Sequence, residues 1–322
     1  MTPASVRALL SGLVDYAGLF PPAALGMDAV VAEYARWRRS PEAWMLGRFV
    51  VPAARLVELA RSADAHWPEP GAGEPWRLSA LVGADAHGDA ARLAAFNTEH
   101  AGRAVVDTAE LKAGSPHEAE AALDAVPAGV TPFVEVPLGE DLGGLLDALK
   151  RRGARAKVRT GGVVPEAIPD PAAVARFITA CAAAGVSFKA TAGLHHPVRA
   201  DQALTYEPGS PRAVMHGFLN VFAAAAFARG GASLAELEAV LREEDSLAFR
   251  FDDPGLTWHG RSASTDALAA ARRDFASSFG SCSFAEPVAD LRALGFLAPE
   301  SQPALARGLA PEGQPAGPRG LS

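Results

Sequence analysis

The segment 156–199 constrains the fold more than any other part of the chain. It reads AKVRTGG, then a spacer of helical length, then GVSFKATAGLHHPVR. Inside the spacer, Asp170 followed by Pro171 is typical of a helix start, and Gly185 can end that helix. Each flanking stretch is a short apolar strand that carries one lysine and ends in a glycine loop. The segment therefore predicts a βαβ unit whose two strands lie parallel in one sheet.

The same alternation of strand and helix runs through the rest of the chain. Besides the two strands of the βαβ unit, we expect strands at residues 13–17, 44–52, 78–83, 104–111, 130–136 and 247–252. Further helices are expected at residues 2–13, 27–39, 53–65, 90–100, 116–126, 142–153, 212–229, 233–243, 265–278 and 286–294. Eight strands alternating with helices predict one α/β domain over residues 1–297, a (βα)8 TIM barrel with extra N-terminal and C-terminal helices.

Two points stay open in this assignment. An open doubly wound sheet is the alternative fold, although no Gly-rich dinucleotide fingerprint follows an early strand. The segment FRFDDPGLTWH, which contains the expected eighth strand, also fits a β-hairpin that turns at Asp253-Pro254-Gly255. Residues 298–322 are rich in proline, glycine and alanine, and we expect them to form a disordered tail.

Charge and cysteine content narrow the class of protein. The net charge of −7 and the lack of a basic stripe argue against a nucleic-acid partner. No segment reaches the ~18 uninterrupted apolar residues that a membrane span requires. Two cysteines, Cys181 and Cys282, do not make a disulfide framework, as is typical of a reducing cytosol. We therefore expect a cytoplasmic protein with a small-molecule substrate, no membrane partner and no cofactor; a homo-oligomer is left open.

In a TIM barrel the active site lies at the carboxyl ends of the strands. In the fifth strand, TPFVEVP, the valines should face the helices, so that Glu135 points into the barrel. The same alternation points four more side chains inward: Lys157, Arg159, Lys189 and Thr191.

Two other strands offer polar side chains. In the fourth strand the alternation does not decide which of Asp107, Glu110 and Lys112 faces inward. In the expected eighth strand Arg250 and Asp252 are candidates for the interior.

Lysine is rare in this chain, with four residues against 26 arginines. Because three of the four follow or lie in expected strands, an amine rather than a guanidinium is indicated there. We expect the cationic neighbours of Lys189 and its partial desolvation to lower its pKa. A neutral amine can attack a carbonyl and form a Schiff base, which serves as an electron sink for cleavage of a carbon–carbon bond. The alternatives are a buried Lys189–Glu135 ion pair and a lysine that binds substrate without a covalent bond.

Residues 157–193 resemble the deoxyribose-phosphate aldolase group of the class I aldolases. In that group a strand with an early lysine is followed by a helix that ends near Ala-Gly, and then by a strand whose lysine precedes a Thr/Ser–Gly turn. Here AGVSFKATAG carries the second pattern. The resemblance implies an aldolase barrel and makes Lys189 the Schiff-base lysine.

Two loops complete the candidate site. The loop Arg159-Thr160-Gly161-Gly162 offers a guanidinium and backbone N–H groups to a carboxylate or phosphate, or else holds a structural arginine. His195 or His196 is a candidate acid or base. Adjacent residues point apart, so at most one of the two would ligate a given metal ion. Cys282 has no obvious base partner in the sequence, and we expect a structural role for it.

Together these features predict a class I aldolase-like lyase that acts on a small carbonyl or carboxylate metabolite. The expected catalytic residues are Lys189, Lys157, Glu135, His195 and His196, with Lys157 tuning the pKa of Lys189. The expected binding residues are Arg159, Gly161, Gly162, Thr191, Asp107 and Asp252, and no metal is assigned. The alternatives are a metal-assisted hydrolase or lyase on the same barrel, and a barrel that binds a metabolite without catalysis.

Overall fold

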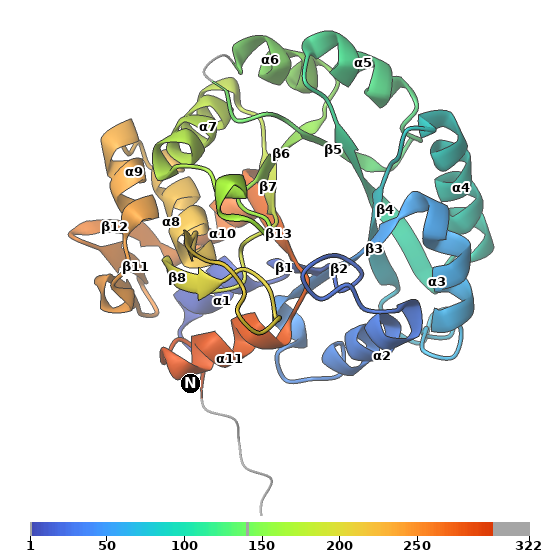
Figure 1. Cartoon of the computed structure of the whole chain (residues 1–322), viewed down its shortest axis with the longest axis horizontal. Coiled ribbons are helices and arrows are strands. Elements are labelled where there is room, and N and C mark those ends of the chain that lie inside the picture. Colours follow the sequence, from blue (N-terminus) through green and yellow to red (C-terminus); the bar gives the residue numbers. More distant parts are fainter. Residues whose placement is uncertain (1, 140–141, 299–322) are drawn as a thin grey trace, which may run out of the picture.

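Eight parallel strands close into a barrel in the computed structural model, which describes residues 2–139 and 142–298. The strands are β1 (Val14–Tyr16), β2 (Leu46–Pro52), β3 (Trp76–Leu81), β4 (Ala104–Lys112), β5 (Thr131–Glu135), β6 (Arg155–Arg159), β7 (Phe188–Thr191) and β13 (Ala276–Ser281). Neighbours follow the order β1-β13-β7-β6-β5-β4-β3-β2 around the ring. With helices alternating along the chain and lying outside the strands (Figure 1), the predicted (βα)8 TIM barrel is confirmed.

The helices cover the outer face of the ring. They are α1 (Ala4–Leu10), α2 (Met27–Trp37), α3 (Leu56–Ala63), α4 (Ala86–Glu99), α5 (Pro116–Asp124), α6 (Gly143–Arg151), α7 (Pro171–Ala184), α8 (Phe218–Arg229), α9 (Leu234–Arg242), α10 (Thr265–Asp274) and α11 (Ala285–Ala293). Short 3-10 turns lie at η1 (Ala43–Met45), η2 (Ala53–Arg55), η3 (Pro165–Ala167) and η4 (Ser246–Ala248). In the part of the chain that the structure describes, no helix has both the length and the apolar character needed to cross a membrane.

Local sequence signals fix the ends of α7 as expected. Asp170 Oδ1 accepts the N–H of Ala172 at 2.8 Å, and Gly185 closes the helix in the left-handed region at φ 67°. Helix α4 begins at Ala86, earlier than the predicted residue 90, with Asp85 as its N-cap. Asp89 accepts the N–H of Gly83 and so ties the loop after β3 to the helix.

The position of the eighth barrel strand was predicted wrongly. Residues 247–252 contain β10 (Phe249–Phe251), which pairs antiparallel with β11 (Gly255–Trp258) and, through it, with β12 (Arg261–Ser264) outside the barrel. This is the hairpin that the turn residues at 253–255 allowed. The true eighth strand is β13, which we expected to begin as helix; its sequence ASSFGS has small polar residues where an apolar strand was sought.

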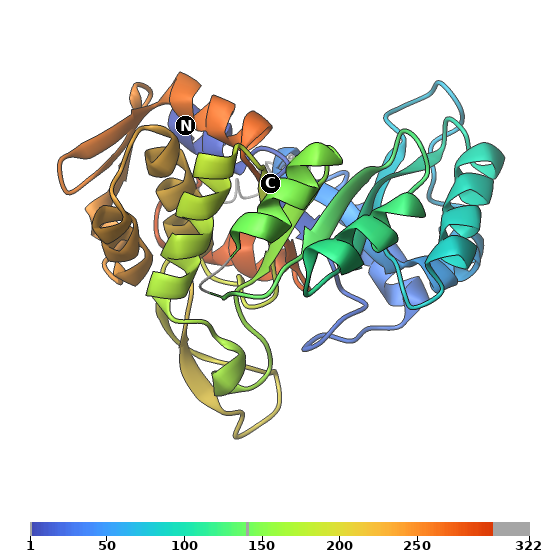
Figure 2. The same cartoon turned by 90° about the horizontal axis from the view of Figure 1, so that it is seen from above.

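A second departure lies between β7 and α8. Residues 212–215 were predicted as helix but form β9 (Arg212–Met215), which pairs antiparallel with β8 (Ala200–Ala203). This hairpin and the segment that holds η3 extend together away from the barrel (Figure 2). Leu204 and Met215 reach the cavity described below, so the insertion contributes to its wall. The predicted tail falls almost entirely on residues 299–322, which are outside the described part of the chain.

Candidate active site

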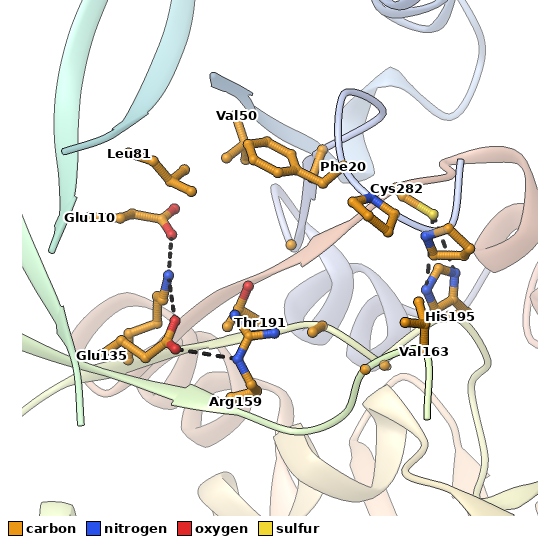
Figure 3. A pocket seen from close by; sticks show the side chains of 18 of the residues that line it. Phe20, Val50, Leu81, Glu110, Glu135, Arg159, Val163, Thr191, His195 and Cys282 are labelled. Carbon is orange, nitrogen blue, oxygen red and sulfur yellow. Dashed lines mark hydrogen bonds and ion pairs between the residues drawn. The ribbon is translucent and has the colours of Figure 1, made fainter. Parts of the chain in front are cut away.

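A cavity of about 340 Å3 opens at the carboxyl ends of the barrel strands, where TIM barrels hold their active sites. Its polar side chains come from strand ends and from the segments after them: Glu110, Lys112, Glu135, Lys157, Arg159, Thr191, His195 and Cys282. Apolar side chains such as Phe20, Val50 and Leu81 line the rest. Figure 3 shows Glu110, Glu135 and Arg159 at one end of the cavity, and His195 with Cys282 at the other.

Two lysines and three carboxylates form a row of alternating charges inside the barrel. One end of the row lies beneath the cavity and the other end lies in its wall. Lys189 Nζ lies 2.7 Å from Asp15 Oδ2 and 2.6 Å from Glu110 Oε1. Lys157 Nζ lies 2.8 Å from Glu110 Oε2 and 2.9 Å from Glu135 Oε2. Because each ammonium contacts two carboxylates, the two lysines, which sit side by side in the register of β6 and β7, are held together without net repulsion.

The neighbouring charges determine the protonation of this row. Burial alone would raise the pKa of Glu110, but the ammonium groups of Lys189 and Lys157 outweigh burial and hold that pKa well below its ordinary value. The pKa of Glu135 is lowered for the same reason, chiefly by Lys157. Both carboxylates are therefore ionised at neutral pH.

The expected low pKa of Lys189 is wrong. Burial lowers the pKa of this amine, yet Asp15 and Glu110 more than compensate and raise it above the ordinary value. The residue is 1% exposed and is not among the residues that line the cavity. Its ion-pair partners are Asp15 and Glu110, whereas Glu135 pairs with Lys157, Arg159 and Lys112. Of the two lysines on β6 and β7, Lys157 is the one that faces the cavity.

The loop of residues 159–162, which was expected to hold an anionic group, follows the strand that carries Lys157. The side chain of Arg159 is about half exposed at the cavity, and its Nε lies 3.2 Å from Glu135 Oε1. Gly162 and Thr191 also line the cavity, but Gly161 does not. Gly161 instead packs against Gly193, because a Cβ on Gly161 would lie 2.8 Å from the Cα of Gly193. The close approach keeps the loops after β6 and β7 together.

The two adjacent histidines have separate environments. His195 lines the cavity, its Nδ1 is 2.9 Å from Glu286 Oε2, and Cys282 Sγ is 4.0 Å from both ring nitrogens. His196 turns to Asp290, 2.6 Å away, and does not line the cavity. Burial alone would lower the pKa of His195, but Cys282 and Glu286 outweigh it and raise the pKa to about 9. Cys282, for which the sequence offered no base, thus has a histidine beside it.

Besides Gly161, two further expected binding residues do not line the cavity. Asp107 is held by Arg48 and Arg77, with Oδ1 2.6 Å from Arg48 Nε. Asp252 accepts the N–H of Gly255 in the turn after β10, outside the barrel. In β4 it is Glu110 and Lys112, two residues apart, that line the cavity, and Asp107 does not. The register between β3 and β4 shifts after Leu78.

No group of three or more His, Cys, Asp or Glu side chains within residues 2–139 and 142–298 is arranged to hold a metal ion. The acidic side chains of the cavity already contact lysine or arginine. Comparisons with known protein families, with curated proteins and with solved structures find no match to this chain.

Proposed function

We propose that this barrel is a class I aldolase-like lyase in which Lys157 forms a Schiff base with a small carbonyl metabolite that carries an anionic group. The observation that carries the proposal is that Lys157 Nζ lies at the wall of the strand-end cavity, within 2.9 Å of two carboxylates. The amine that was first favoured, Lys189, is sealed beneath it. The resemblance of residues 157–193 to the deoxyribose-phosphate aldolase group supports a lyase on the same barrel segment.

Glu135 gives Lys157 a route to the neutral amine. The Lys157 ammonium passes one proton to Glu135 Oε2, which lies 2.9 Å away, and the neutral amine attacks the substrate carbonyl carbon. The carbonyl oxygen, protonated by Glu135, leaves as water, and an iminium remains on Lys157. Glu135, again an anion, takes the proton of the substrate's β-hydroxyl, and the bond between the α and β carbons breaks so that its electron pair enters the iminium. The β fragment departs as an aldehyde and an enamine remains on Lys157; protonation of the enamine carbon by Glu135 and hydrolysis of the iminium release the second carbonyl product and the free amine.

Glu110 is less suited to this proton transfer. Its Oε1 accepts hydrogen bonds from Lys189 at 2.6 Å and from Ser79 at 2.7 Å. These two donors beneath the cavity stabilise Glu110 as an anion. Lys189 therefore acts as a positioning residue that fixes Glu110 against Lys157. The anionic end of the substrate is assigned to Arg159, whose guanidinium is half exposed, and to the loop that contains Gly162.

Borohydride trapping tests the proposal directly. The purified protein is incubated with a panel of small ketones and aldehydes that carry a carboxylate or phosphate, reduced, digested and analysed by mass spectrometry. We expect a reduced adduct on the peptide that contains Lys157, and its loss in Lys157→Met.

Lys112→Met is the matched control, because Lys112 lines the same cavity but is 72% exposed in its side chain. This variant should keep the Lys157 adduct. An adduct only on Lys112 or Lys189, or no adduct with any compound that is turned over, contradicts the covalent route. Thermal stabilisation by a ligand without any adduct or turnover would instead indicate a barrel that binds metabolites without catalysis.

A further inference from the structure

Four segments that are distant in sequence bring a thiol, an imidazole, a carboxylate and a phenol together at the end of the cavity away from Lys157. His195 comes from the loop after β7, Tyr206 from the β8–β9 hairpin, Cys282 from the end of β13 and Glu286 from α11. His195 and Cys282 both line the cavity, so a ligand in it meets them (Figure 3).

The contacts within this group orient the imidazole. Glu286 Oε2 lies 2.9 Å from His195 Nδ1 and accepts the hydroxyl of Tyr206 at 3.0 Å. When Nδ1–H donates to this carboxylate, Nε2 is left as the acceptor of the ring. Cys282 Sγ is 4.0 Å from Nε2 and 3.6 Å from the Tyr206 hydroxyl. A thiol, a base and a carboxylate that orients the base are the parts of an activated cysteine nucleophile, and such contacts are often long before a ligand binds.

We propose that Cys282, His195 and Glu286 form a nucleophilic thiol site in the cavity wall, and that this site takes an aldehyde as a thiohemiacetal. The choice of an aldehyde rests on the proposed function, since carbon–carbon cleavage at Lys157 releases one. The cavity then holds both carbonyl fragments of one reaction, one at the amine and the other at the thiol.

The step needs no oxidant and no further reactant. His195 Nε2 takes the proton of the Cys282 thiol, and the resulting thiolate attacks the aldehyde carbon. One sulfur–carbon bond forms, the carbonyl π bond breaks, and the oxygen takes the proton back from His195. The reverse sequence releases the aldehyde unchanged.

The titratable groups around the Cys282 sulfur decide which of them can hold the thiol proton. The titratable groups that face Cys282 are His195, Tyr206, Glu286 and Tyr16. Burial raises the pKa of Tyr16 and Tyr206 first of all, so both phenols stay neutral and donate hydrogen bonds. The pKa of His195 is raised to about 9, so the proton that its Nε2 accepts from Cys282 is held on the ring as an imidazolium.

Alkylation of the full chain by iodoacetamide tests the thiol, with the modified peptides quantified by mass spectrometry. At pH 6 we expect Cys282 to react about tenfold faster than a free thiol, because His195 beside the sulfur takes the proton that the thiol loses when it attacks. Cys181 is an internal control: it is buried in α7, its pKa is raised by burial, and it should stay unmodified.

Histidine variants show whether His195 is the base. His195→Gln should slow the alkylation of Cys282 at pH 6 about tenfold, and Glu286→Gln should slow it by less. His196→Gln, the neighbouring histidine that turns to Asp290, should leave the rate unchanged. A Cys282 that reacts no faster than a free thiol at pH 6, or at the same rate in His195→Gln and Glu286→Gln, overturns the thiol site.

Protection by glycolaldehyde tests the ligand. Millimolar glycolaldehyde should slow the alkylation of Cys282 in the wild type and in Lys157→Met, where no Schiff base at residue 157 can block the cavity. Equal rates with and without glycolaldehyde in Lys157→Met overturn the aldehyde assignment. Failure of borohydride trapping at Lys157 would instead count against the lyase, and it would not alter the alkylation results, so the two proposals fail separately.

Discussion

Glu110 and Lys157 meet inside the barrel across an intervening strand, with Glu110 Oε2 2.8 Å from Lys157 Nζ. They lie on β4 and β6, and β5 between them supplies Glu135 to the same ammonium at 2.9 Å. The other oxygen of Glu110 is 2.6 Å from Lys189, so one carboxylate bridges two ammonium groups. Removal of any member takes one ion-pair partner away from its neighbours in the row, and the cost depends on what partners remain and on how far the charge is from water.

Lys189→Met should destabilise the protein more than Lys157→Met. Asp15 is fully buried, and without Lys189 it loses its cation, for which a loss of about 3–5 kcal/mol in the free energy of unfolding is typical. After Lys157→Met, Glu135 keeps Arg159 and lies at the cavity, where water can reach it. Urea denaturation of both variants measures the difference. Equal losses would show that Lys189 is not the buried support of this row.

Glu110→Gln should weaken the fold at neutral pH and much less in acid. The pKa of Glu110 is lower in the folded protein than in the unfolded chain, so the folded state binds fewer protons. Its contribution is therefore complete above pH ~4.3 and is lost as pH falls below that value toward the folded pKa. Urea denaturation at pH 7 and pH 3 should show the wild type and the variant converging in acid.

Glu120→Gln is the control for Glu110→Gln. Glu120 pairs with Arg151 at 2.7 Å on the surface, where an ion pair contributes little at any pH. A gap between wild type and Glu110→Gln that is the same at both pH values would contradict the ionised state of Glu110.

Local sequence rules predicted most of the barrel and several inward-facing side chains. They did not predict the ion pairs of the row of alternating charges inside the barrel. Alternation pointed Glu135, Lys157, Arg159 and Thr191 to the interior, and all four line the cavity. It could not supply the partners of Lys189, since these lie 174 and 79 residues away along the chain and are set only when the ring closes.

Three features could not be predicted from the sequence, each for a physical reason. Glu110 was one of three candidates in its strand, where a register shift in β3–β4 interrupts the period of two. Strand β13 was missed because serines replace apolar residues, and one of them, Ser278, points inward to Asp15 at 2.7 Å. Cys282 and His195 come together only through the loops after β13 and β7, whose paths no short-range pattern encodes.

His216 should make the protein less stable as pH falls from 7 to 4. Its Nε2 lies 2.8 Å from the Pro169 carbonyl, and burial lowers its pKa to about 4. The unfolded chain, with a pKa near 6.5, therefore binds the proton first, and stability that is present above pH ~6.5 is lost toward pH 4. The shift corresponds to about 3 kcal/mol at pH 4.

His216→Gln, which can keep a hydrogen bond to Pro169, measures this contribution. The loss of unfolding free energy between pH 7 and pH 4 should be about 3 kcal/mol smaller in the variant than in the wild type. His87→Gln, at an exposed position in α4, should retain the wild-type pH dependence. If the unfolding free energy fell equally with pH in His216→Gln and in the wild type, His216 would not be a buried neutral ring in the folded protein.

Gly161→Ala should separate the loops that follow β6 and β7. The new Cβ would lie 2.8 Å from the Cα of Gly193, a backbone atom that cannot turn aside, so we expect a cost of about 1–3 kcal/mol in unfolding free energy. Because Arg159 and Thr191 end these strands at the cavity, Schiff-base trapping at Lys157 should slow as well. Gly114→Ala is the control, since its Cβ meets Glu118 at an ordinary 3.5 Å. Equal stability and trapping in the two variants would mean that the glycine contact does not position the cavity wall.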